Sequence, residues 1–536
     1  MVSTPAYDPP AAPSPDAALI AKAATARHTG TIVAGCLAVC LAQIGLVLPA
    51  AINGVMQRTL QTSGGELTWI SDAFLVPAAV LALTFGVVGD LYGRKKLVVG
   101  AALLSAVGYL VSATSDSAAQ LITGQAISGI GAAALFPASL AMVIAGTPTP
   151  AARAKGLASW TTALSLGALI APLMSGGIVE HVSFQWAFGV TGVLAVITAV
   201  GAWLLAAESS APEGRSLDWP GQIAIAVAML TLLYGIIQGP SDGWGSAPVV
   251  ACFVAFAVFL AVFVLVENRS AAPMLRLELF RIPAFAASAA MAVIGMFGFL
   301  GGAYDLSIRL GVIQHQSPFQ AALPFVVVQG ITPFIWPLLV RLLHRVGPGP
   351  MLVTGFVSLA VAQLWLRAVP IDETGLVPLL GPLVLNGVGF GLVVAALTAA
   401  AVNVVPPTLT GMASATTSLV RDLGQTLGPA VVGAVALGLA TSQLTGSLAD
   451  LGLTPKEHGI ASAVLHEGGP LALHTADLGP LSTKLAPYTT DALAHGYNNG
   501  LILTAAACLA AAVIAAVFVG LRPGGTRPAE AEGSTA

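Results

Sequence analysis

The chain has 536 residues, of which 56% are hydrophobic and only 8% are charged, and its formal net charge is −3. Soluble domains carry roughly 25% charged residues, so this sequence cannot cover most of its length with a water-exposed surface. The composition disfavours a soluble enzyme, a nucleic-acid-binding protein and a fibrous protein. Since a membrane-spanning helix takes about 20 apolar residues, the sequence predicts an all-α membrane protein with about a dozen spans or more.

Residues 1–29 are rich in proline and alanine, which predicts a disordered tail. Long apolar runs then alternate with short breaks and predict fourteen membrane-spanning helices, followed by a second tail at 522–536. The seventh run is the weakest. The predicted spans are residues 31–53, 68–88, 97–115, 119–144, 156–178, 184–206, 219–238, 247–267, 284–308, 319–342, 349–369, 376–402, 411–438 and 499–521.

The basic residues test this number of spans, because Lys and Arg are enriched in cytoplasmic connections. With both termini in the cytoplasm, the inner segments hold fifteen of the 21 Lys and Arg residues, and the outer segments hold only Arg58, Arg367, Lys456 and Lys484. The inner fifteen are Lys22, Arg27, Arg94, Lys95, Lys96, Arg153, Lys155, Arg215, Arg269, Arg276, Arg281, Arg341, Arg345, Arg522 and Arg527. The bias supports an even number of spans in a multi-pass protein of the cell membrane.

One connection is long: residues 440–497, predicted on the outer side. Its histidines are His458, His466, His474 and His495, and their spacings match no metal-ligand pattern. A solvated, partly ordered outer loop is therefore the favoured interpretation, and no metal site is predicted. The chain also lacks GxxxxGK[ST], HExxH and GxSxG motifs, so the sequence gives no reason to expect an enzyme, ATP drive or a cofactor.

A short basic motif runs from the end of the second predicted span into the following turn and contains Gly86, Asp90, Gly93, Arg94 and Lys95. Glycines allow a tight turn between closely packed helices, and the acid can pair with a base. This segment resembles the GxxxD(R)xGRR(K) loop of the major facilitator superfamily, which in that family latches the two halves of the protein in one access state. A basic turn that only fixes topology is the alternative, but it would not explain the glycines and the acid together.

Gly167, Pro172 and Gly176 in the fifth span are similar to the GxxxGPxxGG antiporter motif of the same superfamily, with Ala171 and Ser175 where glycine is usual. Small side chains at all these positions would allow close helix packing and a bend at the proline. A simple small-residue helix interface is the alternative interpretation.

Two further stretches, 217–245 and 406–428, resemble the inserted helix pair and the thirteenth span of the fourteen-span drug/proton antiporter branch. The resemblance extends over about residues 31–521. It implies an N-terminal six-helix bundle at 30–206, an inserted pair at 207–283 and a C-terminal six-helix bundle at 284–521. It also implies a monomer that exports lipophilic small molecules such as antibiotics by alternating access, driven by protons.

Two positions depart from the family pattern. The first span has Gln43 where an acidic residue is usual, and the fourth has Gln125 where an arginine is usual. Because charges inside a bilayer are costly unless paired, the joint absence of an acid and a base is self-consistent. It puts the usual proton-coupling route of the family in question. It also motivates an alternative function, that of an uncoupled facilitator, a sensor or a lipid-handling protein with the same fold.

The remaining ionisable residues within the spans are candidates for proton coupling or substrate binding. Arg421 shares a helix face with a stripe of polar residues at mid-membrane, which predicts a cavity there. Asp422 points about 100° away, so we expect each of these two residues to have a different partner. A polar network that only braces the helix is the alternative.

Asp305 and Arg309 have the i, i+4 spacing that favours an ion pair, predicted near the outer end of the ninth span. Asp72 lies near the outer end of the second span and has no base close to it in the sequence. It is interpreted either as a buried proton carrier or as part of a solvated helix start.

Overall fold

The computed structural model describes residues 15–147, 149–211, 217–270, 273, 275–406 and 409–520. Every regular element in these ranges is a helix. Fourteen of the helices are long and apolar enough to cross a membrane, which confirms the predicted number. The predicted tail at 522–536 and Arg215 lie outside the described residues.

The first six helices pack together and are called the N-half. In this half α3 packs against α4 and α6, α2 packs against α4, and α1 packs against α5. Their bounds are α1 (Pro15–Leu60), α2 (Gly64–Tyr92), α3 (Arg94–Ala113), α4 (Ala118–Ala145), α5 (Pro150–His181) and α6 (Phe184–Leu205).

The second group of packed helices is called the C-half. In this half α9 packs against α13 and α15, and α11 packs against α12 and α15. The bounds are α9 (Pro283–Ile308), α10 (Pro318–Val346), α11 (Pro348–Ala368), α12 (Leu376–Val402), α13 (Thr410–Asp450) and α15 (Pro480–Ile514). A short 3-10 helix, η1 (Leu277–Arg281), precedes α9, and a π-helical turn, η2 (Arg309–Ile313), follows it. A second π-helical turn, η4 (Ala515–Val519), follows α15.

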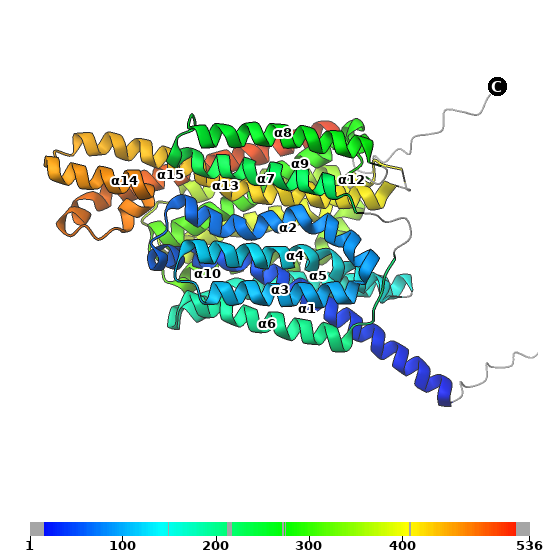
Figure 1. Ribbon diagram of the computed structural model, residues 1–536. Helices are drawn as coiled ribbons and strands as arrows, with labels where there is room; N and C mark the ends of the chain where they lie inside the picture. Colours follow the sequence, from blue (N-terminus) through cyan, green and yellow to red (C-terminus); the bar gives the residue numbers. More distant parts are fainter. Residues whose placement is uncertain are drawn as a thin grey trace, which may run out of the picture.

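Helices α7 (Trp219–Asp242) and α8 (Ala247–Arg269) lie between the halves in sequence and at one side of the bundle in space (Figure 1). α7 packs against both α2 and α13, where Val76, Ile225 and Leu419 share one apolar cluster. The amide of Gln222 fastens α7 to α2, because its Nε2 donates to the carbonyl of Val80 at 3.0 Å and its Oε1 accepts from Thr84. α8 is peripheral and apolar on most of its surface, as expected for a helix that faces lipid.

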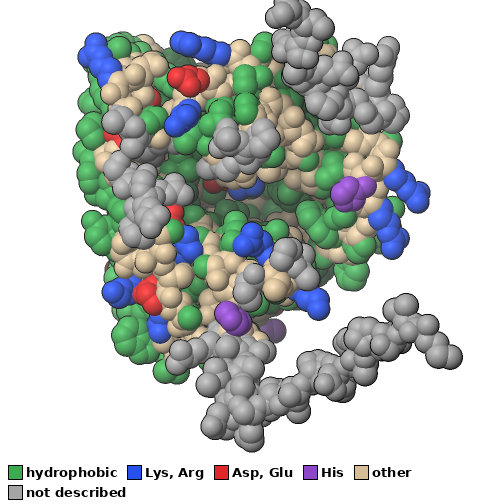
Figure 2. Space-filling model, turned by 90° about the vertical axis from the view of Figure 1, so that its right-hand side faces the viewer, with side chains coloured by type: hydrophobic (Ala, Val, Ile, Leu, Met, Phe, Trp, Pro, Cys, Tyr) green, Lys and Arg blue, Asp and Glu red, His purple; other side chains and the backbone are tan. Residues whose placement is uncertain are grey.

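The two ends of the bundle differ. One end carries the start of α1, the α2–α3 turn with Arg94 and the end of α10 with Arg345; we call it the basic end. Figure 2, which looks onto this end, shows Lys and Arg side chains around a central hollow. The opposite end carries α14 (Pro455–Thr475) and is called the α14 end; there α14 and its neighbours project beyond the rest of the bundle (Figure 1).

The prediction that residues 440–497 form a partly ordered loop is wrong, because most of this segment is helical. α13 continues to Asp450, α14 occupies Pro455–Thr475, and α15 already begins at Pro480. Apolar side chains on the three helices, among them Leu448, Leu465 and Leu485, are buried against one another. The stretch is too polar to be identified as a membrane span, but it keeps enough leucine and alanine to form an amphipathic hairpin that packs on itself.

The prediction of a disordered tail is also wrong for residues 15–29, which continue α1 as helix. This stretch is rich in alanine, the residue with the highest helix propensity. Residues 1–14 lie outside the described part of the chain.

Candidate functional site

Arg421 and Asp422 lie in the first third of α13. Arg421 lies about 16 Å along this helix, counted from Thr410 at 1.5 Å per residue. Although α13 packs against α2, α7, α9 and α15, the side chains of Arg421 and Asp422 remain 35% and 27% exposed. Basic and acidic side chains are visible within the hollow in Figure 2. A charged pair inside a helical bundle that is still partly exposed indicates a polar cavity rather than contact with lipid.

Arg421 and Asp422 pair with each other, which corrects the expectation of separate partners. The Nε and Nη2 atoms of Arg421 donate to Oδ1 of Asp422 at 3.3 and 3.2 Å. Gln425 Nε2 donates to the same oxygen at 3.0 Å. A helical wheel follows Cβ directions only, whereas the long arginine side chain curls back around the helix to its neighbour. The result is one compact, partly exposed polar group inside the bundle.

The two halves are joined at the α14 end. Within the described residues, all hydrogen bonds between the N-half and the C-half lie in the part of the bundle towards that end. Arg58 of α1 donates to the carbonyl of Gly311 at 2.7 Å, and Glu180 of α5 accepts from the backbone N–H of Phe319 at 3.1 Å. Because the hollow opens at the basic end, the structure is open at one end and closed at the other.

Glycine makes the closest contact between the halves possible. A Cβ atom added to Gly54 of α1 would collide with the backbone of Gly311 in η2. Beside it, Asn53 Nδ2 donates to Ser307 Oγ at 3.0 Å, and Ser307 Oγ donates to the carbonyl of Ala50. Backbones that approach this closely exclude any side chain between them, so the contact depends on glycine in both elements.

Asp72 of α2 is completely buried, so the solvated-helix interpretation is wrong. Neither of its carboxyl oxygens has a hydrogen-bond partner. Gln125 of α4 is equally buried and equally unpartnered. The two helices touch where Gly129 meets the backbone of Phe74, about one turn from these side chains. Gln125 therefore lies on the face of α4 that packs against α2, at about the level of Asp72.

Asp305 and Arg309 do not form the predicted ion pair. Arg309 instead donates to three carbonyl oxygens at the end of α11: Leu366 at 3.1 Å, Val369 at 3.0 Å and Pro370 at 2.5 Å. Both carboxyl oxygens of Asp305 are buried without a hydrogen-bond partner. The π-helical turn that begins at Arg309 changes the i, i+4 geometry, and the unpaired carbonyls at a helix C-terminus attract a guanidinium.

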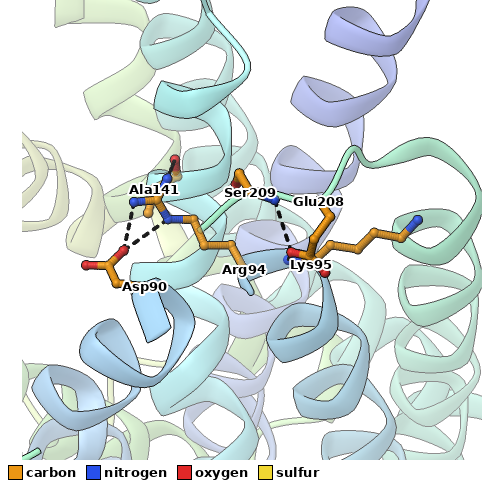
Figure 3. A network of polar contacts seen from close by, with 6 residues as sticks. All are labelled: Asp90, Arg94, Lys95, Ala141, Glu208 and Ser209. Atoms are coloured by element: carbon orange, nitrogen blue, oxygen red, sulfur yellow. Dashed lines mark hydrogen bonds and ion pairs between the residues drawn. The ribbon is translucent and has the colours of Figure 1, made fainter. Parts of the chain in front are cut away.

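The α2–α3 turn is held by a polar network within the N-half (Figure 3). Arg94 donates from Nε and Nη2 to Oδ1 of Asp90 at 3.1 and 2.7 Å. The segment after α6 joins the network, because Glu208 accepts from the backbone N–H of Lys95 at 3.0 Å. Gly93 has φ +109°, and a Cβ atom there would also strike the Glu208 carboxylate, so glycine is required on both counts. Gly86 packs loosely on Pro137.

The glycines of α5 serve two different contacts. A Cβ atom at Gly167 would lie 3.0 Å from Cβ of Gln43 in α1, and one at Gly176 would lie 2.7 Å from Cβ of Ala322 in α10. Pro172 lies inside the helix between them. The first glycine packs α5 within the N-half, and the second packs it across to the C-half.

Three groups of residues were missed by the sequence analysis. Glu208 lies in a connection without a motif. Tyr304 and Thr68, which form a 2.8 Å hydrogen bond between the halves, are common residues in apolar helices. A signal existed only for His474, as one of the four histidines noted in the outer connection.

His474 lies where α14 meets both halves. Its ring stacks on that of His315 at 5.1 Å, and its Nδ1 lies 3.0 Å from Thr489 Oγ1. Burial, with a smaller contribution from His315, lowers the pKa of His474 to about 4. Burial and the neighbouring Arg58 lower the pKa of His315 as well. Both imidazoles are therefore held in the neutral form.

Comparison with known proteins identifies the fold and the family. The sequence model of the Major Facilitator Superfamily matches residues 33–429. The chain belongs to the major facilitator superfamily. It is therefore a membrane transporter and not an enzyme, and its two packed halves have the arrangement of that superfamily.

Similar proteins include several resistance proteins of the superfamily. The chain is 28% identical over 436 residues to the multidrug resistance protein Stp of Mycobacterium tuberculosis (strain CDC 1551 / Oshkosh), covering 81% of this chain and 80% of that protein. It is 25% identical over 413 residues to the tetracenomycin C resistance and export protein of Streptomyces glaucescens, covering 76% of each.

Among solved structures, a bacterial homologue of the human lysosomal transporter Spinster, inward-facing and unoccupied, shares the fold. It has a TM-score of 0.63 and 16% identity, and the match covers 92% of this chain and 96% of that one. The family and the fold predicted from the sequence are thus confirmed.

Proposed function

We propose that this major facilitator exports lipophilic small molecules, antibiotics among them, across the cell membrane in exchange for protons. The observation that carries the proposal is a hollow that opens at the basic end and is closed at the α14 end, in a bundle that holds the partly exposed Arg421–Asp422 pair. The relatives named above are resistance and export proteins, which supports the same direction of transport.

The orientation follows from charge. Lys and Arg are concentrated at the basic end, and the positive-inside bias makes that end cytoplasmic, with both termini in the cytoplasm. In that orientation the described state receives substrate from the cytoplasm or the inner leaflet. Export then requires the α14 end to open and the basic end to close, which is alternating access between the N-half and the C-half.

Substrate contact is assigned to Arg421, Asp422 and Gln425. The carboxylate is already neutralised by the guanidinium and bonded to the amide. A group that is internally paired offers dipoles rather than a net charge. It therefore suits a lipophilic molecule with a few polar atoms better than a strongly charged one.

We assign proton binding to carboxyl groups within the membrane-spanning helices. Asp72 and Asp305 are buried, 0% and 1% exposed, without hydrogen-bond partners, and a carboxyl without a counter-charge can bind and release a proton as its access changes. Asp422 has its own counter-charge and is the weaker candidate. One charge that moves through 100 mV supplies about 2.3 kcal/mol, enough for a nearly 50-fold substrate gradient.

The test is ethidium uptake into inverted membrane vesicles, the direction that corresponds to export from the cell, with and without an imposed pH gradient. Asp72→Asn, Asp305→Asn and Asp422→Asn are compared with Asp116→Asn, which changes an exposed carboxyl outside the spans. We expect the gradient to accelerate transport in the unaltered protein and in Asp116→Asn, and to lose its effect in Asp72→Asn or Asp305→Asn. Equal gradient dependence in all four variants would remove proton coupling through these acids.

A further inference from the structure

The N-half and the C-half meet along two lateral seams. At one seam α2 packs against α13, and at the other α5 packs against α10. A gap in either seam would connect the interior of the bundle with the lipid around it. The two seams differ in how they are covered.

The seam between α2 and α13 is covered by α7 along its length. Near the basic end Gln222 of α7 donates to a carbonyl of α2, and near the α14 end the amide oxygen of Gln238 would lie 3.2 Å from a Cβ atom added to Gly65. α13 shares an apolar cluster with α7. Among the described residues at 67–91 and 412–438, no large apolar side chain is exposed. This seam is therefore closed to lipid.

The seam between α5 and α10 is tightly packed only towards the α14 end. A Cβ atom added to Gly176 of α5 would lie 2.7 Å from Cβ of Ala322 in α10. About two helical turns nearer the basic end, one added to Gly330 would lie 3.6 Å from Cδ1 of Leu169. The two helices run antiparallel, so the next pair on the same faces follows after another two turns.

At that next level the seam is open. Two further turns set Thr162 of α5 opposite Pro337 of α10, and both residues are exposed. No residue of α10 at 321–332 is exposed, whereas the side chains that follow include Phe334 at 85% and Leu338 at 60% exposed. The packing between the two helices thus ends about halfway along the seam.

The sequence of α10 explains why the helices separate there. Pro333 and Pro337 lie inside this helix, and each removes a backbone hydrogen bond that a straight helix needs. The opposite side of α10 stays attached to α12, where Thr332 Oγ1 donates to the carbonyl of Gly387 at 3.3 Å and Leu339 is 2% exposed. A helix weakened at the prolines and held on α12 diverges from α5.

The edges of this gap suit apolar molecules. Phe334 projects from one side, and on the other the hydroxyl of Thr162 donates to the carbonyl of Ala158 in its own helix at 2.8 Å. The exposed bases Lys155 and Arg341 stand only at the limit towards the basic end, the level at which lipid headgroups meet basic side chains. The gap itself lies at the depth of the acyl chains.

The polar pair of α13 faces away from the covered seam. Arg421 lies two residues from both Leu419 and Leu423, which pack in the cluster with α7. Two residues correspond to about 200° around a helix, so the side chain of Arg421 projects from α13 on the side opposite α7. It is directed into the bundle, and the seam without α7 is the lateral approach to it.

We propose that lipophilic substrates pass from the cytoplasmic leaflet into the bundle through the gap between α5 and α10, bordered by Thr162 and Phe334. This entry route rests on the proposed export function and on the orientation given there. Lipophilic molecules concentrate in the bilayer, because removal of apolar surface from water is favourable. A lateral gap therefore admits them at a higher concentration than an aqueous mouth does, and α7 restricts this exchange to one seam.

Obstruction of the gap tests the route, because an obstacle on a path slows entry and exit equally and leaves the equilibrium affinity unchanged. Thr162→Cys and Phe334→Cys are made in a background without the four native cysteines, which are free thiols, and are modified with a bulky aromatic methanethiosulfonate. Binding and release of ethidium are followed by fluorescence in lipid nanodiscs. We expect each adduct to lower both rate constants about tenfold through a higher barrier, with Kd nearly unchanged. Dithiothreitol, which removes the adduct, should restore both rates.

Two positions carry the same adduct as controls. Val258 of the peripheral helix α8 is 57% exposed, so an adduct on Val258→Cys adds bulk on a lipid-facing surface away from both seams. Arg345 is exposed at the basic end, so an adduct on Arg345→Cys adds bulk beside the aqueous mouth. Neither adduct should change the two rate constants.

A second measurement needs no substrate. Bimane attached to Phe334→Cys should be quenched by lipids brominated on their acyl chains, because the tails reach the gap. Leu419→Cys, at a position 7% exposed beneath α7, should react with the bimane reagent much more slowly than Phe334→Cys.

The route is overturned if both gap adducts leave the rates unchanged, or if the adduct on Arg345→Cys slows binding more than they do. It is also overturned if the gap adducts change Kd instead of both rates, which would make these residues part of the binding site, or if brominated lipids do not quench the bimane. Ethidium uptake into inverted vesicles separates this failure from that of the export proposal. Uptake with adduct-insensitive binding keeps export and removes the route, and adduct-sensitive binding without uptake does the reverse. Absence of any ethidium binding would overturn both.

Discussion

The two ends of the bundle are held by different kinds of contact. At the α14 end the N-half and the C-half are joined by isolated hydrogen bonds and by backbone packing at Gly54. Some of these bonds are between neutral groups, as in the pairs Asn53–Ser307 and Thr68–Tyr304, and two join a charged side chain, Arg58 or Glu180, to the backbone of the other half. At the basic end the main polar network joins Asp90, Arg94 and Glu208, all on the N-half side. A bond between neutral groups contributes about 1 kcal/mol, and a bond to a charged group contributes about 1.5–3 kcal/mol.

This difference indicates which contacts must break when the transporter opens at one end and closes at the other. The α14 end can open without separating an ion pair, because none crosses it among the described residues. The basic-end network stabilises the N-half itself. We expect it to fix the position of the α2–α3 turn, on which the C-half must close in the opposite state.

The largest effect is expected from removing the glycine contact at the α14 end. Gly54→Val places a branched side chain against the backbone of Gly311. Overpacking costs about 1–3 kcal/mol, so the closed form of the α14 end should become roughly tenfold or more less populated. Spin-label distances between Gln61→Cys and Gln320→Cys measure this. Gly100→Val, at a position with open space around it, is the control, and equal distances in both variants would contradict the closure described here.

The next effect is expected from the basic-end network. Arg94→Ala removes two hydrogen bonds to Asp90, whose side chain is 11% exposed. Hydrogen bonds to charged groups contribute about 1.5–3 kcal/mol, so the thermal unfolding midpoint in detergent should fall. Lys96→Ala changes an exposed base in the same turn and should leave the midpoint unchanged. Equal midpoints for Arg94→Ala and the unaltered protein would show that the network does not stabilise the N-half.

The attachment of α14 should weaken in acid. The pKa of His474 is about 4 in the folded protein, against an ordinary value of 6.5. Its neutral form is the folded one, so the stability that it contributes is complete above pH 6.5 and is lost as pH falls towards 4. Protonation would also put a positive charge on His474 beside His315, which is itself close to Arg58.

Hydrogen exchange of residues 455–475, corrected for the intrinsic pH dependence, measures this loss. We expect exchange to accelerate below pH 6.5, and the acceleration to disappear in His474→Asn. His458→Asn, on an exposed part of the same helix, should behave like the unaltered protein. Acid-independent exchange in the unaltered protein would rule out a role for the histidine pair.

The smallest effect concerns the surface of the α14 hairpin. The ammonium of Lys484, 2.6 Å from Glu457, and the bonds from Thr454 lower the pKa of Glu457 to about 2. Lys484→Ala should raise this pKa towards its ordinary value with little change in stability, because exposed ion pairs contribute little. Titration of the ¹³C-labelled carboxyl by NMR checks it, with Lys456→Ala as the control. An unchanged pKa in Lys484→Ala would mean that the pair does not form in solution.

Much of the protein is determined by its sequence. The apolar runs set the number of spans, because hydrocarbon accepts only long apolar helices whose backbone bonds are internally satisfied. The motifs at Gly86–Lys95 and Gly167–Gly176 gave the family, which needed no tertiary structure. The hairpin at α14 was missed, because its polar residues conceal an amphipathic pattern that becomes stable only when three helices pack together.

The tertiary structure alone decided which polar side chains meet. Sequence spacing predicted a partnership of Asp305 with Arg309 and separate partners for Arg421 and Asp422, and both expectations failed. Long side chains and a π-helical turn redirect charges by several ångströms, which local periodicity does not contain. Likewise, Thr68 and Tyr304 are 236 residues apart, and only the packing of α2 on the C-half brings their hydroxyls together.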